Sequence, residues 1–467
     1  MLQVLWGVGG MVVVLAIAWL LSVDRRRINY RTVSLALLVQ VVFGVLVLYV
    51  PAGQRVLEAV TSGVQSVINS SAAGIEFLFG PILPDEGSVF AFQVLPVIVF
   101  FAALTAVLYH VGLLQLVTRW IGGALAKLLG TTGPESMNAA ANIFVGQTEA
   151  PLVIRPYIKD MTPSEIFAVM AGGLTTVAGS VLVGYSLLGA NLEYLIAASF
   201  MAAPAGLLMA KMLVPAGAVA GIGPNAESAA TPDARVTDPA DADAADDGDT
   251  SRRGGSRLMA AFRRGSRRGG THEGRDELVR RARGKDTADD EDEEEPPVNV
   301  IDAAARGASD GLTLALNVGA MLLAFISLIA LANIVVGGIG GWFGNEDLSV
   351  EEILGYVFSP IMAAVGVPLH EAVDAGSFLG QKVILNEFVA FSDFAPNAGD
   401  FSEKSQAVIT FALTGFANLG SLAILLGGLG GIAPTQRSVI ATLGLRAVLA
   451  GTLGNLLSAA IAGILIG

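Results

Sequence analysis

Long apolar runs with almost no charged residues recur along the whole chain. A helix that crosses a membrane needs about 20 apolar residues, and most of these runs are long enough. Only 15% of the 467 residues are charged, whereas a typical soluble domain carries about 25%. We therefore exclude a soluble helical bundle and expect an all-α polytopic membrane protein. The runs cover residues 2–23, 32–57, 87–118, 167–191, 195–210, 311–345, 405–436 and 447–467.

The first apolar run lacks the features of a cleaved signal peptide. No basic residue precedes it, and Arg25, Arg26 and Arg27 follow it. Arginine clusters beside a membrane helix favour the cytoplasmic side. We therefore expect the N-terminus to lie outside the cell and this run to remain as the first span of a multi-pass protein.

The residue types that most enzyme centres require are scarce. The chain has no cysteine, which excludes disulfides and thiolate ligands. The three histidines, His110, His272 and His370, are far apart in the sequence, so no metal cluster is indicated. The glycine-rich stretch 337–341 ends an apolar run and follows no strand, which argues against a phosphate-binding loop. We expect no enzymatic activity, no cofactor and no nucleic-acid partner.

Residues 216–300 differ in composition from the rest of the chain. They contain 13 Lys and Arg and 19 Asp and Glu, with few aromatic or β-branched residues. Such a segment cannot bury enough apolar surface to offset the entropy of ordering. We expect a disordered charged loop on the cytoplasmic side. Its basic part, 252–268, either contacts anionic lipid headgroups or is a solvated linker.

An internal repeat relates the two halves of the chain. Five residues recur unchanged 239 positions later, and a short polar element lies upstream of each copy, at 147–149 and at 386–387. Two copies with matching polar interruptions are typical of transporters whose repeats meet at a site near the middle of the membrane. The repeated residues are Ala168, Val169, Leu174, Thr175 and Ala178, which match Ala407, Val408, Leu413, Thr414 and Ala417.

The first polar element predicts a re-entrant hairpin. Gly146 permits a tight bend, and Pro151 cannot continue an ordinary helix. Glu149 would then lie at membrane depth, where an ionised side chain costs about 2.5–3.5 kcal/mol or more. We favour a ligand or ion contact for Glu149, and the alternative is a structural ion pair with Arg155 or Lys159.

A second hairpin is expected over 375–393, with its tip at 385–390. Glu387 faces the same energetic cost as Glu149, and its alternative ion-pair partner is Lys382. Farther on, residues 414–421 place glycine and asparagine inside an apolar run, which indicates an unwound stretch with exposed carbonyl oxygens. An amide buried in such surroundings needs several hydrogen-bond partners.

These features divide the chain into segments. We expect N-terminal transmembrane helices with an interfacial segment over 1–89, and a scaffold helix with the first hairpin repeat over 90–215. The charged loop follows over 216–300, and a scaffold helix with the second hairpin repeat over 301–467.

The motifs of both halves resemble the signature stretches of the concentrative nucleoside transporter family, and they occur in the family's order. The resemblance covers residues 90–215 and 300–467. The insert at 216–300 departs from the compact family pattern, which leaves the role of that loop open. The matching stretches are GQTEAPL (146–152), NEFVA (386–390) and GFAN (415–418), with APAG (203–206) and PL (368–369).

The resemblance implies a homotrimer in the cell membrane, with about eight transmembrane helices and two re-entrant hairpins in an inverted repeat in each protomer. It implies that the first hairpin contacts the nucleobase and that the second hairpin holds the ribose. The implied substrate-binding residues are Gln147, Thr148, Glu149, Glu387, Phe416, Asn418 and Ser421. The implied sodium ligands are Asn142, the Val145 carbonyl, Thr176 and the Val177 carbonyl.

The sequence therefore predicts a cation-coupled symporter that imports nucleosides. Sodium is the expected coupling ion, and a proton stays open as the alternative. Gly146 leaves room beside the base, so we expect purines to be accepted as well as pyrimidines. Two other functions are considered, namely a membrane protein that recognises nucleosides without transporting them, and a symporter of another polar solute. The pairing of Glu387 with Asn418 favours a sugar over other solutes.

Overall fold

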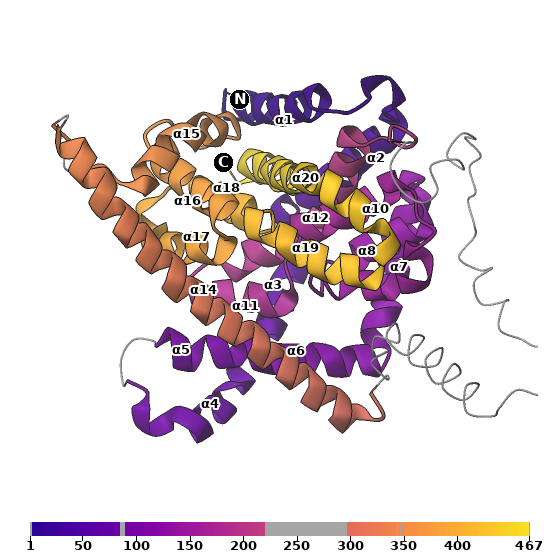
Figure 1. Cartoon of the computed structure of the whole chain (residues 1–467), viewed down its shortest axis with the longest axis horizontal. Coiled ribbons are helices and arrows are strands. Elements are labelled where there is room, and N and C mark those ends of the chain that lie inside the picture. The colour runs from indigo at the N-terminus through magenta and orange to yellow at the C-terminus, as the bar shows by residue number, and fades with distance from the viewer. Residues whose placement is uncertain (1, 85–88, 220–296, 343, 346, 467) are drawn as a thin grey trace, which may run out of the picture. The chain divides into compact units, whose positions relative to one another are not determined.

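The computed structural model describes residues 2–84, 89–219, 297–342, 344–345 and 347–466 (Figure 1). Within these residues every regular element is helical, which confirms the predicted all-α membrane fold. Residues 220–296 of the charged loop lie outside the described residues. Its disorder and its cytoplasmic location therefore stay predictions.

Six helical segments in the described ranges are long and apolar enough to cross a membrane. Two shorter apolar helices, Val4–Leu20 and Leu419–Ile432, bring the total to the expected number of about eight. The six long segments are Tyr30–Tyr49, Phe90–His110, Pro163–Leu187, Leu192–Leu213, Val300–Trp342 and Pro434–Leu465.

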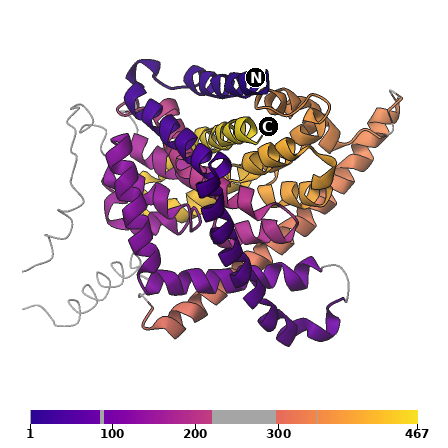
Figure 2. The same ribbon diagram turned by 180° about the vertical axis from the view of Figure 1, so that it is seen from behind.

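The N-terminal helices pack on the outside of the repeats. They are α1 (Leu2–Leu20), α2 (Tyr30–Gly44), α3 (Pro51–Ser70) and α4 (Ala72–Phe79). Asn29 begins α2, because its side-chain oxygen accepts hydrogen bonds from two backbone N–H groups of the first turn. Helices α2 and α3 contact α12 (Leu192–Leu213) and cross the face shown in Figure 2, where they are indigo.

Each half contains a hairpin, a broken helix and a long closing helix. In the first half these are α8 (Gly133–Ala141) with α9 (Arg155–Ile158), α10 (Pro163–Thr175) with α11 (Gly179–Leu187), and α12. In the second half they are α16 (Ala372–Ile384) with α17 (Glu387–Phe394), α18 (Glu403–Leu413) with α19 (Leu419–Ile432), and α20 (Arg437–Leu465). Thr162 and Ser402 cap α10 and α18 in the same way, since each hydroxyl accepts a backbone N–H at 3.4 Å.

Both predicted hairpins are confirmed as turns inside the helical fold. The second hairpin reverses at Leu385 and Asn386, between α16 and α17. The first hairpin is less regular, because Pro151 prevents an α-helix and the returning arm begins as a 3-10 segment, Ala150–Ile154. Its first arm, α8, begins at Gly133 with a capping box formed by Thr132 and Glu135.

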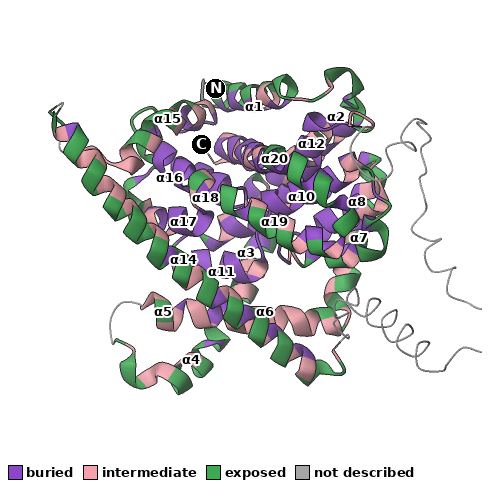
Figure 3. Cartoon of the chain, viewed as in Figure 1, coloured by how far each residue is buried: buried purple, intermediate pink, exposed green. Residues whose placement is uncertain are grey.

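Two scaffold helices lie beside the repeats and pack tightly against each other. They are α6 (Leu95–His110) and α14 (Val300–Trp342). A Cβ atom on Gly307 would lie 2.5 Å from Ala106 Cβ, and one on Gly311 would lie 2.6 Å from Ala102 Cβ. Small residues thus allow the close approach that membrane helices use. The other faces of α14 are largely exposed (Figure 3). Their exposed side chains include large apolar ones, such as Leu323 at 74% exposure.

The remaining helices connect these parts. They are α5 (Phe90–Gln93), α7 (Leu113–Leu129) and α15 (Val350–Ala364). α15 packs against α16, and α7 packs against α8, so each hairpin has a neighbouring helix that supports its first arm.

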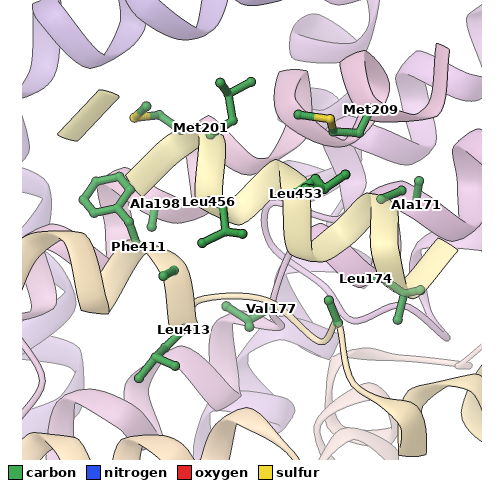
Figure 4. Close-up of a cluster of buried hydrophobic side chains, with 14 of the residues drawn as sticks. Ala171, Leu174, Val177, Ala198, Met201, Met209, Phe411, Leu413, Leu453 and Leu456 are labelled. Carbon is green, nitrogen blue, oxygen red and sulfur yellow. The ribbon is translucent and has the colours of Figure 1, made fainter. Parts of the chain in front are cut away.

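The core lies where the two halves meet. Helices α10, α12 and α18 all pack against α20, and their buried side chains interdigitate around the two helix breaks (Figure 4). The residues labelled there come from both repeats: Ala171, Leu174, Val177, Ala198, Met201, Met209, Phe411, Leu413, Leu453 and Leu456. This arrangement places the polar breaks inside an apolar core rather than at its edge.

Candidate functional site

Two helix breaks at corresponding positions form the centre of the candidate site. The helix ends at Thr175 in the first half and at Leu413 in the second, and it resumes at Gly179 and Leu419. The unwound stretch predicted at 414–421 is therefore confirmed over 414–418. Each threonine at the break bonds back one turn, Thr175 Oγ1 to the Ala171 carbonyl at 2.6 Å and Thr414 Oγ1 to the Thr410 carbonyl at 2.7 Å.

The two breaks are joined by hydrogen bonds. Phe416 donates its backbone N–H to the Thr176 carbonyl at 3.1 Å. Asn455 of α20 donates its side-chain amide to the carbonyls of Thr175 at 2.7 Å and Thr414 at 2.6 Å. Non-helical backbone at membrane depth must find partners inside the protein, and Asn455 provides them for both repeats at once.

Gly415 allows the breaks to approach this closely. A Cβ atom at this position would lie 2.3 Å from Asn455 Oδ1 and 2.7 Å from the Thr175 carbonyl oxygen. Those contacts involve a bonded amide and a backbone atom, neither of which can move away freely. We therefore assign Gly415 a role in joining the breaks.

The second hairpin delivers Glu387 to the break of its own half. Asn386 caps α17 by accepting the Val389 N–H at 2.9 Å, which places Glu387 in the first turn. There the positive end of the helix dipole favours a carboxylate. Glu387 is 5% exposed. Its Oε1 accepts a hydrogen bond from the Tyr185 hydroxyl at 3.0 Å, and its Oε2 accepts one from Asn418 Nδ2 at 2.9 Å.

Asn418 links Glu387 to α19. Its Oδ1 accepts the backbone N–H of Ser421 at 2.8 Å and so caps the first turn of α19. The structure thus brings together Glu387, Asn418 and Ser421, with Phe416 two residues before Asn418 on the same unwound stretch.

The predicted residues of the first hairpin lie against α10 and α19. Glu149 folds back over the tip, where its Oε2 accepts the Gly146 N–H at 2.5 Å. Thr148 contacts α19, since a Cβ atom on Gly428 would lie 2.9 Å from Thr148 Cγ2. Gln147 packs against α10, since a Cβ atom on Gly173 would lie 2.8 Å from Gln147 Cβ. Among the described residues, no hydrogen bond joins this tip to Glu387 or Asn418.

The predicted sodium ligands cluster around the first break. Phe144 accepts the Gly179 N–H at 3.0 Å, which ties the hairpin tip beside Val145 to the end of the break beside Val177. Thr176 Oγ1 donates to the Gly172 carbonyl at 3.0 Å, so its lone pairs stay available. Asn142 is fully buried.

Several buried acceptors in this region have no donor. Asn142 Oδ1, Asn138 Oδ1 and Gln147 Oε1 are buried, and none accepts a hydrogen bond in the part of the chain that the structure describes. A buried polar atom without a partner costs about 1–3 kcal/mol. Neutral amide and carbonyl oxygens are ligands that hard cations prefer. The oxygen atoms at the first break therefore form a set of ligands that fits a cation such as sodium.

The ion pairs considered as alternatives are not formed. Lys382 donates to the Ala412 carbonyl at 2.7 Å and to Asn455 Oδ1 at 2.9 Å rather than to Glu387. None of the ion pairs within the described residues includes Glu149 or Glu387. Neutral groups therefore donate the hydrogen bonds to both carboxylates. The alternative interpretation, in which Glu149 and Glu387 form structural ion pairs, was wrong.

Sequence reasoning missed two residues of this site. Tyr185 and Asn455 were not singled out, and Lys382 was considered only as the alternative ion-pair partner of Glu387. Asn455 could have been found, because it is an amide within the apolar run 447–467, the same signal that marked Asn418. Tyr185 had no such signal, since tyrosine is common in apolar segments.

Comparisons with known proteins find nucleoside transporter families and transporters similar to this chain. Residues 194–463 match the family described as "Na+ dependent nucleoside transporter C-terminus", residues 9–82 match its N-terminus, and residues 91–191 match the family "Nucleoside recognition". The chain is 49% identical to the "Uncharacterized transporter YutK" of Bacillus subtilis, over 100% of both chains. It is 44% identical to the "Nucleoside permease NupC" of Helicobacter pylori, over 99% of this chain and 98% of that one.

The fold is also that of a solved transporter. CNTnw in an inward-facing substrate-bound state is 47% identical to this chain, with a TM-score of 0.80 over 99% of this chain and 98% of that one. Variants of CNTnw in outward-facing and intermediate states match similarly. With two polar hairpins, two joined helix breaks and matches over nearly its whole length, the chain belongs to the concentrative nucleoside transporter family.

Proposed function

We propose that the protein is a sodium-coupled symporter that imports nucleosides across the cell membrane. The observation that carries the proposal is Glu387, a buried carboxylate at the start of α17 that is held by Tyr185 and Asn418 beside the joined breaks. The family membership supports a nucleoside as the substrate.

The hydrogen bonding of Glu387 suits a ribose diol. An ionised carboxylate has about four lone-pair sites, and Tyr185 and Asn418 use one on each oxygen. The remaining sites accept two neighbouring hydroxyl groups, which is the arrangement at the 2′ and 3′ positions of ribose. Asn418 keeps the carboxylate oriented while its own oxygen caps α19.

Removal of either ribose hydroxyl is expected to weaken binding. Without it, a buried acceptor on Glu387 has no partner, which costs about 1–3 kcal/mol or about 5–150-fold in affinity. The measurement is competition of 2′-deoxyuridine and 3′-deoxyuridine against labelled uridine on the purified protein. 5′-Deoxyuridine keeps the diol and serves as the matched control. Equal affinities for all four nucleosides would mean that Glu387 does not bind the ribose diol.

The first hairpin is proposed to contact the nucleobase. Gln147 offers an amide donor and acceptor, and Glu149 offers carboxylate oxygens, one of which accepts the Gly146 N–H. We expect adenosine to compete with labelled uridine within about tenfold of uridine itself, a difference of about 1.4 kcal/mol. Uridine binding without any competition by adenosine would contradict the proposed acceptance of purines.

Sodium is proposed to be held by Asn142, Thr176 and the carbonyls of Val145 and Val177. The bound ion would supply the positive charge that the unpaired oxygen atoms at this break lack. These residues connect the hairpin tip to the broken helix, so they hold the tip in the form that contacts the nucleoside. Cation and nucleoside then stabilise the same arrangement, and each raises the affinity for the other by the same factor.

Residues 216–300 and the cluster Arg25–Arg27 are proposed to lie on the cytoplasmic side.

A homotrimer is proposed as the assembly. The apolar surface of α14 supports it, where Leu316, Leu323 and Ile334 are 62%, 74% and 73% exposed. Lipid or neighbouring protomers would cover this surface. Native mass spectrometry of the detergent-solubilised protein checks the stoichiometry.

A second candidate function is recognition of nucleosides without transport. Counterflow separates the two functions without requiring a gradient. Proteoliposomes are preloaded with unlabelled uridine and diluted into labelled uridine, with equal sodium on both sides. A transporter produces a transient accumulation of label inside, whereas a receptor that only binds produces none above the bound amount.

A further inference from the structure

The C-terminal ends of α10 and α18 occupy corresponding places in the two repeats. Thr175 and Thr414 differ by the repeat offset of 239, and Asn455 bonds the carbonyl oxygens of both. The last carbonyls of a helix lack donors within the helix and carry the negative end of its dipole. Both helix ends therefore favour a positively charged partner.

In the first repeat this helix end faces an uncharged oxygen atom of the hairpin. Asn142 lies at the end of α8, and a Cβ atom on Gly173 of α10 would lie 3.8 Å from Asn142 Oδ1. That oxygen accepts no hydrogen bond within the described residues. No lysine or arginine in those residues bonds the last carbonyls of α10.

In the second repeat the corresponding place holds a lysine ammonium. Lys382 lies in the last turn of α16, which is the first arm of its hairpin, and it is fully buried. Its Nζ donates to the carbonyl of Ala412 at 2.7 Å, and Ala412 is the repeat counterpart of Gly173. It also donates to Asn455 Oδ1 at 2.9 Å.

We propose that the Lys382 ammonium is a tethered cation that takes, in the second repeat, the place of the exchangeable cation in the first. The proposal rests on the proposed function, since it assumes a cation at Asn142 and Thr176. Each half then has a positive charge at the C-terminal end of its broken helix. In the first half it is an ion that can dissociate, and in the second half it is the Lys382 ammonium, which cannot.

The tethered charge also fixes the orientation of Asn455. Because Nζ donates to Oδ1, the amide nitrogen of Asn455 faces the Thr175 and Thr414 carbonyls and donates to both. Lys382 is therefore a positioning residue that acts on the substrate site through Asn455 and the α18–α19 break. The α18–α19 break and the contact of Asn418 with Glu387 therefore stay in place whether or not a cation is bound in the first repeat.

The test replaces Lys382 with alanine, which removes the charge and leaves space for an ion, and with arginine, which keeps the charge. Uridine binding and the Tm without uridine are measured against sodium concentration at constant ionic strength, with choline as the replacement cation. For the wild type we expect a Hill coefficient of about 1 for sodium. For Lys382→Ala we expect a coefficient that rises toward about 2, because a second sodium ion fills the vacated place, and a midpoint raised on the order of 5–150-fold. Lys382→Arg should retain the wild-type coefficient.

Three outcomes overturn the proposal or remove its premise. A folded Lys382→Ala protein with the wild-type sodium dependence of both uridine binding and Tm overturns it. If Lys382→Ala does not fold, Asn142→Lys decides, because a tethered ammonium in the first repeat should make uridine binding independent of sodium. Sodium-dependent or absent binding by folded Asn142→Lys overturns the proposal. Wild-type binding without any cation dependence would instead contradict the proposed function and take the inference with it.

Discussion

Replacement of Glu387 with glutamine is expected to weaken uridine binding by about 100-fold or more. The substitution removes a charge that accepts the hydrogen bonds of Tyr185 and Asn418, at 3.0 and 2.9 Å. It also adds an amide donor where the ribose hydroxyls require an acceptor. Each hydrogen bond to a charged group contributes about 1.5–3 kcal/mol, and two such bonds to the ribose account for the expected factor. Calorimetric titration with uridine at saturating sodium measures it.

The matched control for this prediction is Glu76→Gln. It makes the same chemical change at an exposed position of α4, away from the hairpins. The control should bind uridine like the wild type. If Glu387→Gln folds normally and binds uridine within about threefold of the control, which is less than 1 kcal/mol, Glu387 does not hold the nucleoside.

Replacement of Asn455 with leucine is expected to destabilise the protein by several kcal/mol and to reduce uridine binding. Leucine leaves the Thr175 and Thr414 carbonyls without their side-chain donor and removes one of the two acceptors of the Lys382 ammonium, which keeps the Ala412 carbonyl. Each buried group that loses its partner costs about 1–3 kcal/mol. Binding falls as well, because the two breaks are no longer held together. Thermal unfolding followed by intrinsic fluorescence, combined with uridine titration, measures both effects.

Thr452→Val on the same helix is the control for Asn455→Leu. The Thr452 hydroxyl bonds only the Val448 carbonyl of its own helix, at 3.0 Å, so its loss should change Tm little. An Asn455→Leu protein as stable as this control would mean that the two breaks are held by packing rather than by the amide.

The sequence predicted those parts of the fold that depend on local residue patterns. Apolar runs gave the spans because lipid accepts few charges, and Gly146 with Pro151 gave the first hairpin because neither suits a helix interior. The repeat predicted two equivalent polar elements, at 147–149 and 386–387, and the structure places each of them at the turn of a hairpin.

Contacts between the halves could not be predicted from local patterns. Tyr185 reaches Glu387 only because α11 packs against α17, across 202 residues of sequence. Lys382 lies five residues before Glu387, so proximity in sequence suggested an ion pair. The break of α18 exposes carbonyls that accept the ammonium instead. The length of α14 was also underestimated, because Asp302 and Arg306 lie on its first turns, outside the apolar run that marks the span.

Cation-driven accumulation of uridine tests the central claim most directly. Proteoliposomes receive labelled uridine under an inward sodium gradient, with equal sodium on both sides, or under an inward proton gradient at equal sodium. The account predicts accumulation above the external concentration only under the sodium gradient, and collapse of that accumulation when a sodium ionophore is added. Accumulation driven by protons alone would contradict the assignment of sodium. Binding without accumulation under either gradient would contradict symport itself.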